Sequence, residues 1–217
     1  MNKIELAKYF DHTLLKQDMS ETDLEKLIRD YDEYGFRTIC IPPMYIKKAR
    51  QINQLISVAT VIDFPLGYSG LTSKLCQTDL ALEQGAEEID LVATVPHIKN
   101  GDLELYANEI SAVKKLMSDK ILKIIIETSL LTPAEIITAS KICEDSGADF
   151  VKTSTGFGVR GASAEDIKLI KQGAPSTMIK ASGGIKTLEQ AQSFIELGVD
   201  RIGSSNSNII LDLFVIS

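Results

Sequence analysis

A short pattern, a glycine followed by an apolar run, occurs four times in this sequence and constrains its fold more than any other feature. It reads GFRTIC from Gly35, GAEEID from Gly85, GADFVK from Gly147 and GVDRIG from Gly198. A glycine just past the end of a helix relieves the left-handed backbone conformation found there. Each copy therefore predicts a point where a helix ends and a strand is about to begin.

The segments between these junctions complete the alternation of strands and helices. Two helices are clear from their patterns: SETDLEKLIRDYDEY, with Ser20 as its cap, and LTPAEIITASKICEDSG, in which Thr132 precedes Pro133 at the first helical position. Other β-rich runs read SVATVIDFP, ILKIIIET and TMIKASGG. Strands are expected near residues 11, 38, 58, 88, 121, 149, 177 and 200.

Eight alternating units without a polar linker predict an α/β fold, a (β/α)8 TIM barrel, in a single domain over residues 1–217. With 44% hydrophobic residues, the chain can build the large core that one such domain needs. A doubly wound open sheet is the alternative. No G-x-G-x-x-G follows the first strand, which weakens that alternative.

Composition also limits the surroundings and the partners. No apolar run approaches the roughly 18 to 20 residues of a membrane span, and the start MNKIELAKYFDHT lacks the apolar stretch of a signal peptide. Three cysteines without metal spacing favour a reduced, cytoplasmic setting, and two isolated histidines argue against a zinc site. The net charge of −7 argues against general nucleic-acid binding. An anionic ligand would therefore need a locally positive pocket.

Counting five residues on from each junction glycine gives Cys40, Asp90, Lys152 and Gly203. If the four junctions share one register, these side chains occupy equivalent places on strands 2, 4, 6 and 8. Alternate strands of a (β/α)8 barrel contribute to the same interior layer. Asp90 and Lys152 are therefore expected to point into one cavity.

Lys152 lies in an apolar run, and Lys180 occupies the corresponding place on the next strand. Such a lysine can reach solvent at the strand end or form a structural ion pair with Asp90. A pair of lysines beside one carboxylate favours chemistry instead, because ammonium groups about 4 Å apart repel by roughly 4 kcal/mol at an effective dielectric constant of 20. That repulsion lowers the pKa of one amine, which can then attack a carbonyl and form a Schiff base. Asp90 would hold the second ammonium and move protons.

A phosphate site is expected in the loops after strands 7 and 8, which read ASGGIK and GSSNSN. In this fold these loops commonly cradle a phosphate with backbone N–H groups, to which hydroxyls and a cation can add. Taken singly, a glycine pair is more often an ordinary turn, and it is the occurrence of both loops at the two expected places that favours a phosphate site. The candidate substrate contacts are Gly156, Gly183, Gly184, Lys186, Gly203, Ser204 and Ser205.

Weaker candidates lie at the ends of other strands. The stretch DHTLLK places Asp11, Thr13 and Lys16 after the first strand, where they can contact a polar substrate or simply cap a turn. Cys40 is interpreted as a small interior residue near the site and, like Thr13, is included among the expected substrate contacts. Lys123 can lie in the interior on strand 5 and join the charged groups there.

Several motifs together resemble the deoxyribose-phosphate aldolase family: FVKTSTGFG, IKASGGIKT, EEIDLV, LKIIIET, RIGSS, YFDHTLLK and VIDFPLG. The match extends over nearly the whole chain. The resemblance implies a class I lyase on a (β/α)8 barrel, independent of metals and cofactors, that takes part in deoxyribonucleotide and carbohydrate catabolism. Its reaction would be the reversible cleavage of 2-deoxy-D-ribose 5-phosphate to D-glyceraldehyde 3-phosphate and acetaldehyde. Family members are often homodimers.

Carried over by motif, the resemblance gives Lys152 the role of Schiff-base nucleophile. Lys180 would be the second lysine that lowers its pKa, and Asp90 the acid and base that works through a water molecule. The phosphate would be held by Gly156, Gly183, Gly184, Gly203 and Ser205.

The sequence departs from the family pattern at several places. Ala93 and Thr94 stand where a more apolar residue and an amide are expected, Lys186 replaces a common arginine, and Asn206 replaces a frequent serine. The tail LDLFVIS lacks the terminal tyrosine of some members. Two alternatives stay open: another Schiff-base aldolase or transaldolase that acts on ketose phosphates, and a catalytically silent barrel that binds a phosphate ligand.

Overall fold

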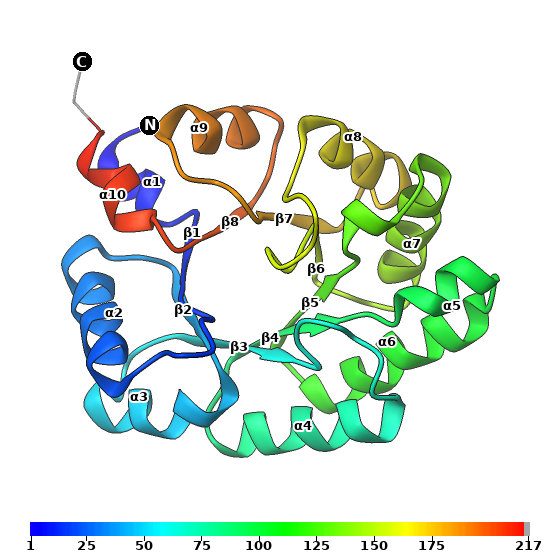
Figure 1. Cartoon of the computed structure of the whole chain (residues 1–217), viewed down its shortest axis with the longest axis horizontal. Coiled ribbons are helices and arrows are strands. Elements are labelled where there is room, and N and C mark those ends of the chain that lie inside the picture. The colour runs from blue at the N-terminus through cyan, green and yellow to red at the C-terminus, as the bar shows by residue number, and fades with distance from the viewer. Residues whose placement is uncertain (215–217) are drawn as a thin grey trace.

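The computed structural model describes residues 1–214 and shows eight parallel strands closed into a barrel (Figure 1). The strands follow one another around the barrel in chain order, and β8 pairs with β1 through Asp11 and Gly203. This closure confirms the predicted (β/α)8 fold and excludes the open sheet. The strands are β1 Phe10–Thr13, β2 Thr38–Ile41, β3 Val58–Ile62, β4 Glu88–Val92, β5 Ile121–Ile125, β6 Phe150–Lys152, β7 Met178–Ser182 and β8 Arg201–Ser204.

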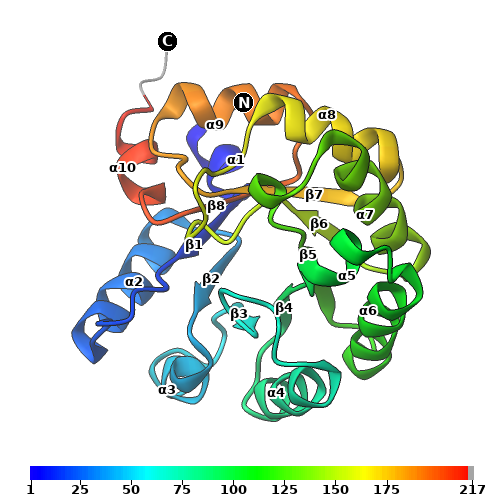
Figure 2. The same cartoon turned by 45° about the vertical axis from the view of Figure 1, so that its right-hand side comes forward.

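Helices surround the strands as an outer ring, which Figures 1 and 2 show from two directions. Those between consecutive strands are α2 Glu21–Tyr34, α3 Ile46–Ile52, α4 Leu71–Glu83, α6 Leu103–Met117, α7 Pro133–Asp145, α8 Ala164–Gly173 and α9 Leu188–Glu196. The chain begins with α1 Lys3–Ala7, and α10 Ser207–Asp212 follows β8. Short turns of helix lie in three loops: η1 Pro43–Tyr45, α5 Val95–Asn100 and η2 Thr128–Leu130.

The predicted helix ends are confirmed by the backbone. Ser20 and Thr132 cap α2 and α7 in reciprocal capping boxes, in which the cap hydroxyl and a carboxylate three residues on satisfy free amides. The four junction glycines all adopt positive φ, between 67° at Gly35 and 102° at Gly85. Because this conformation is strained for other residues, the pattern read from the sequence marks real helix-to-strand junctions.

Apolar and charged side chains occupy different parts of the protein interior. Apolar side chains fill the layer between the strands and the helices, as expected for parallel strands covered on their outer face. Inside the barrel the strands instead carry charged side chains that are at most 5% exposed: Asp11, Glu88, Asp90, Lys123, Lys152, Lys180 and Arg201. Among the helices of residues 1–214, none combines the length and the apolar character needed to cross a membrane.

His12 lies outside the barrel interior, buried against the ring of Phe36 and 3.4 Å from Asp30. Burial lowers the pKa of His12 from 6.5 to about 4.

The stability of the protein should depend on pH through His12. Between pH 6.5 and 4 this residue binds a proton in the unfolded chain but not in the folded protein, so the free energy of unfolding falls as the pH drops from about 6.5 towards 4. We expect a loss of about 3 kcal/mol from this residue alone. Urea unfolding across this pH range checks it. His12→Phe should flatten the curve, and an equally steep curve for that variant would contradict the assignment.

Candidate active site

The charged residues inside the barrel form one connected network centred on Asp90. Its Oδ1 accepts a hydrogen bond from Lys123 at 3.0 Å, and its Oδ2 accepts from both Lys152 at 2.6 Å and Lys180 at 2.8 Å. The structure thus brings together the three residues that the sequence predicts to be catalytic, from β4, β6 and β7. The amines of Lys152 and Lys180 therefore share one oxygen of Asp90 and lie next to each other.

Further groups complete the network beneath this triad. Asp11 accepts hydrogen bonds from Lys180 and from Arg201, the latter at 2.6 Å, and Glu88 pairs with Arg201 and Lys123. Three carboxylates therefore face four basic groups in the barrel interior. The buried charges balance if one base is neutral. Since an unbalanced buried charge is costly, the network favours a neutral amine at one position.

The pKa shifts of the two lysines that share Asp90 Oδ2 have opposite directions. Burial lowers the pKa of Lys152 and the nearby Lys180 ammonium lowers it further, although Asp90 opposes both. Burial would also lower the pKa of Lys180, but Asp11 and Asp90 outweigh it and raise that pKa. The pKa values of the two lysines are thus shifted in opposite directions, and that of Lys152 is lowered as predicted. Burial contributes more to the lowered pKa of Lys152 than Lys180 does, although the prediction rested on the second lysine alone.

The pH dependence of Lys152 alkylation follows from this arrangement. The neutral fraction of Lys152, and so its rate of reductive alkylation by acetaldehyde and cyanoborohydride, should rise through a pKa below the ordinary value of 10.5. Lys180→Met removes one positive neighbour and frees Asp90 to pair with Lys152, so the midpoint should move to higher pH. Mass spectrometry of the labelled lysine against pH checks this shift. A midpoint unchanged in the variant would contradict the coupling.

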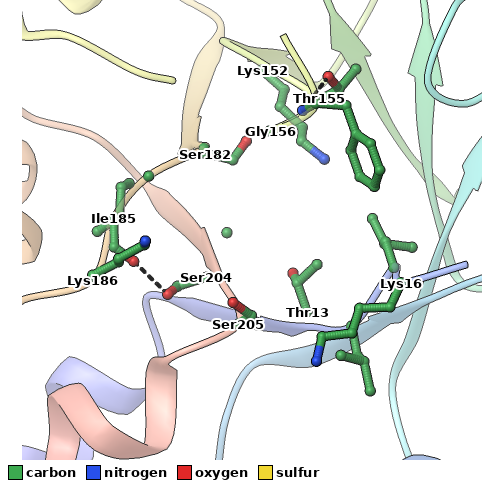
Figure 3. Close-up of a pocket in the computed structure, with 16 residues that line it drawn as sticks. Thr13, Lys16, Lys152, Thr155, Gly156, Ser182, Ile185, Lys186, Ser204 and Ser205 are labelled. Atoms are coloured by element: carbon green, nitrogen blue, oxygen red, sulfur yellow. Dashed lines mark hydrogen bonds between the residues drawn. The ribbon is translucent and has the colours of Figure 1, made fainter. Parts of the chain in front are cut away.

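Lys152 also lines a pocket of about 280 Å³ at the carboxyl ends of the strands. Figure 3 shows its amine pointing into this pocket, with Ser182, Ser204 and Ser205 across from it. Asp90 and Lys180 lie below the pocket, fully buried. The reactive nitrogen is therefore the part of the network that a substrate can reach.

The glycine loops after β6, β7 and β8 form another wall of the pocket. Gly156, Gly183 and Gly184 have positive φ values of 87°, 89° and 75°. Within residues 1–214, the backbone N–H groups of Gly183, Gly184 and Ser205 donate no hydrogen bond. Free amides on loops that line one pocket can bind an anion.

The remaining predicted contacts of these loops have more specific positions. The Ser204 hydroxyl donates to the Ile185 carbonyl at 2.7 Å and so joins the two loops. Gly203 leaves room for its neighbours, since a Cβ there would lie 2.9 Å from the Ser182 side chain and 3.2 Å from that of Lys180. Lys186 is exposed at the pocket rim.

The weaker candidates divide between the pocket and its base. Thr13 lines the pocket and donates to the Asp11 carbonyl at 2.9 Å, which combines the two roles considered for it. Cys40 is fully buried with Ala59 and Val61 and does not line the pocket in the part of the chain that the structure describes. Burial raises the pKa of its thiol. Lys123 lies in the interior, as considered for it.

Sequence reasoning missed Glu88 and Arg201 and left the network role of Asp11 unrecognised. A signal was present, because side chains alternate between the two faces of a strand. Glu88 precedes Asp90 by two positions and Arg201 precedes Gly203 by two, so both had to face the interior. The departures at 93 and 94 are structural: the Thr94 hydroxyl donates to Glu109 at 2.7 Å, outside the barrel interior.

Comparison with known proteins bears on this arrangement. Residues 5–204 match the model of the DeoC/LacD family aldolases. The chain belongs to this aldolase family. Its closed barrel is therefore the fold of this aldolase family. Residues 215–217, the end of the tail LDLFVIS in which the terminal tyrosine of some family members is missing, lie outside the described residues.

Individual family members are similar over almost their whole length. The deoxyribose-phosphate aldolase of Metamycoplasma hominis is 47% identical, over 90% of this chain and 92% of that protein. That of Mycoplasmopsis pulmonis is 46% identical, over 96% of both. The tetrameric deoxyribose phosphate aldolase of Aeropyrum pernix superposes with a TM-score of 0.90 at 32% identity, over 97% of this chain and 91% of that chain.

Proposed function

We propose that this aldolase cleaves 2-deoxy-D-ribose 5-phosphate reversibly to D-glyceraldehyde 3-phosphate and acetaldehyde through a Schiff base on Lys152. One observation carries the proposal. A single amine at the floor of the pocket shares a carboxylate oxygen with a second lysine, and its pKa is lowered while that of its neighbour is raised. A buried amine with a lowered pKa is more often neutral than an ordinary lysine, and a neutral amine is the nucleophile that a class I aldolase needs.

The reaction begins with the open-chain sugar. The Lys152 nitrogen attacks carbon 1, the aldehyde carbon, and the carbinolamine loses water to give a protonated imine. The proton and the departing water require a nearby acid and base, and Asp90 lies 2.6 Å from the attacking nitrogen. Lys180 stays protonated and keeps the position of Asp90 constant through these steps.

Cleavage then uses the imine as an electron sink. The hydroxyl on carbon 3 loses its proton and becomes an aldehyde, the bond between carbons 2 and 3 breaks, and its electron pair moves to the imine to form an enamine. Glyceraldehyde 3-phosphate, which carries the phosphate group of the sugar, then leaves. Protonation of the enamine at carbon 2 and addition of water release acetaldehyde and return Lys152 to its free form. In the condensation direction the same steps run in reverse.

The phosphate of the substrate is held at the other side of the pocket. The free amides of Gly183, Gly184 and Ser205 provide donors, and Lys186 provides a positive charge. Binding the phosphate there places the sugar chain across the pocket with its aldehyde towards Lys152. Binding of the phosphate group also reduces the entropy cost of bringing the aldehyde into the reactive geometry.

Borohydride trapping tests the proposal. The protein is incubated with acetaldehyde, reduced and digested, and the ethyl adduct is mapped by mass spectrometry. We expect Lys152 to be labelled much faster than an exposed lysine such as Lys115. A folded protein that binds phosphate but is not labelled at Lys152 would instead be a silent phosphate-binding barrel.

A substrate panel separates this aldolase from one that acts on ketose phosphates. Condensation with D-glyceraldehyde 3-phosphate is measured with acetaldehyde and with dihydroxyacetone phosphate as donors. Activity with acetaldehyde alone supports the proposal, and activity with dihydroxyacetone phosphate alone overturns it.

We further propose that residues 1–217 act as one catalytic domain, because the eight strands close a single barrel. The homodimer expected from the resemblance stays a prediction, which light scattering checks. The cytoplasmic setting and the place in deoxyribonucleotide breakdown also stay predictions.

A further inference from the structure

Three lysines and no acidic residue line the pocket within residues 1–214. They are Lys152 at the floor, Lys186 on the loop after β7, and Lys16 on the loop after β1. The chain as a whole carries a net charge of −7. The pocket therefore concentrates positive charge against the overall balance, and the mechanism uses only two of its three cations.

The closure of the barrel explains why Lys16 belongs to the phosphate side. Strand β1 pairs with β8, and His12 lies opposite Ser204 in their register. The loop after β1 thus runs beside the loop that carries Ser205. Figure 3 shows the Lys16 amine on the side of the pocket where Thr13 and Ser205 lie, away from Lys152.

The Lys16 and Lys186 amines are also free to bind a ligand. Within the described part of the chain, neither has an ion-pair partner within 4.0 Å or donates a side-chain hydrogen bond. By contrast, the buried amine of Lys74 contacts Glu109, Thr94 and two carbonyls. Lys16 lies on an anchored loop, since the Leu14 amide donates to Cys40 and the Met19 amide to Lys16 itself.

We propose that Lys16 is a second cationic ligand of the substrate phosphate and a determinant of the preference for phosphorylated over unphosphorylated aldehydes. A phosphate monoester carries nearly two negative charges at neutral pH, and Lys186 supplies one positive charge. A lysine acts on such a group as a flexible point charge, so a second one on the adjoining wall adds to the first. The part of this inference that concerns substrate preference rests on the proposed function, whereas phosphate binding does not.

The experiment compares Lys16→Met with Lys115→Met, which removes the same charge from the end of α6 that leads into β5, at the opposite end of the barrel. For each protein kcat/KM is measured with 2-deoxyribose 5-phosphate and with 2-deoxyribose, and the Kd for inorganic phosphate is measured by calorimetry. We expect Lys16→Met to lower the ratio of the two kcat/KM values about tenfold and to weaken phosphate binding by a similar factor. The Lys115 variant should match the parent protein.

Each outcome has a separate meaning. Equal losses on both substrates with unchanged phosphate affinity would overturn the proposal, because they indicate a general disturbance of the pocket. An unchanged ratio and unchanged affinity would overturn it as well. A parent protein without aldolase activity would remove the proposed function, while a weaker phosphate Kd in Lys16→Met would still support the ligand role.

Discussion

Replacing Lys152 by methionine is expected to lower kcat by about 10⁴-fold or more, because no other amine in the pocket can take over the covalent step. Methionine is similar in length and apolar. It replaces the one amine that charge balance favours as neutral, so the three buried carboxylates still face three cations. The variant should therefore fold with little change in its free energy of unfolding. Retro-aldol turnover, coupled to detection of glyceraldehyde 3-phosphate, measures the effect.

The control for this prediction is Lys115→Met, the same substitution on the surface. It should retain the parent kcat and the parent labelling by acetaldehyde and borohydride. Lys152→Met should lose the active-site adduct while it still binds phosphate, since the phosphate contacts lie on other loops. Residual turnover within tenfold of the parent would show that another group forms the covalent intermediate.

Replacing Asp90 by asparagine is expected to destabilise the protein by about 3 to 5 kcal/mol, the usual cost of breaking a buried ion pair by removing one partner. Burial alone would raise the pKa of Asp90, but Lys123, Lys152 and Lys180 outweigh it and hold that pKa well below its ordinary value. The carboxylate is therefore ionised in the folded protein, and it accepts hydrogen bonds from three lysine amines. Urea unfolding at pH 7 measures the loss.

Asp79→Asn makes the same change on the exposed face of α4 and should alter the free energy of unfolding by less than about 0.5 kcal/mol. A small effect at Asp90 would contradict the prediction, because it would mean that the buried cations Lys123 and Lys180 do not depend on its charge. The pH dependence of this contribution follows from the lowered pKa of Asp90. The stability that Asp90 contributes is present above its unfolded pKa of 3.8 and is lost as the pH falls through its folded pKa. The Asp90→Asn variant should therefore show a weaker acid dependence than its parent.

Much of the fold could be predicted because its signals are local. Each strand begins within one residue of its expected position, and the helix caps at Ser20 and Thr132 are where the sequence places them. Local backbone preferences decide such features, and they need no knowledge of distant residues. The common register of the junctions then placed Asp90 and Lys152 in the same interior.

The extent of the charged network could not be predicted in the same way. Asp11 meets Lys180 although 169 positions separate them, and Arg201 meets Asp11 across 190 positions. These contacts exist only because β8 closes on β1, which brings the two ends of the chain together. The same closure places the loop of Lys16 beside the phosphate loops. Without closure, each of these residues is a polar side chain near the end of a strand.

By itself the sequence determined the order of strands and helices, the interior position of Lys152 and the chemical types that surround it, because periodicity and capping are written in neighbouring residues. Only the tertiary structure decided which amines share one carboxylate and which of them has its pKa lowered. The pKa of a buried amine depends on how much water is excluded and on the distances to every other charge, and both are set when the barrel closes.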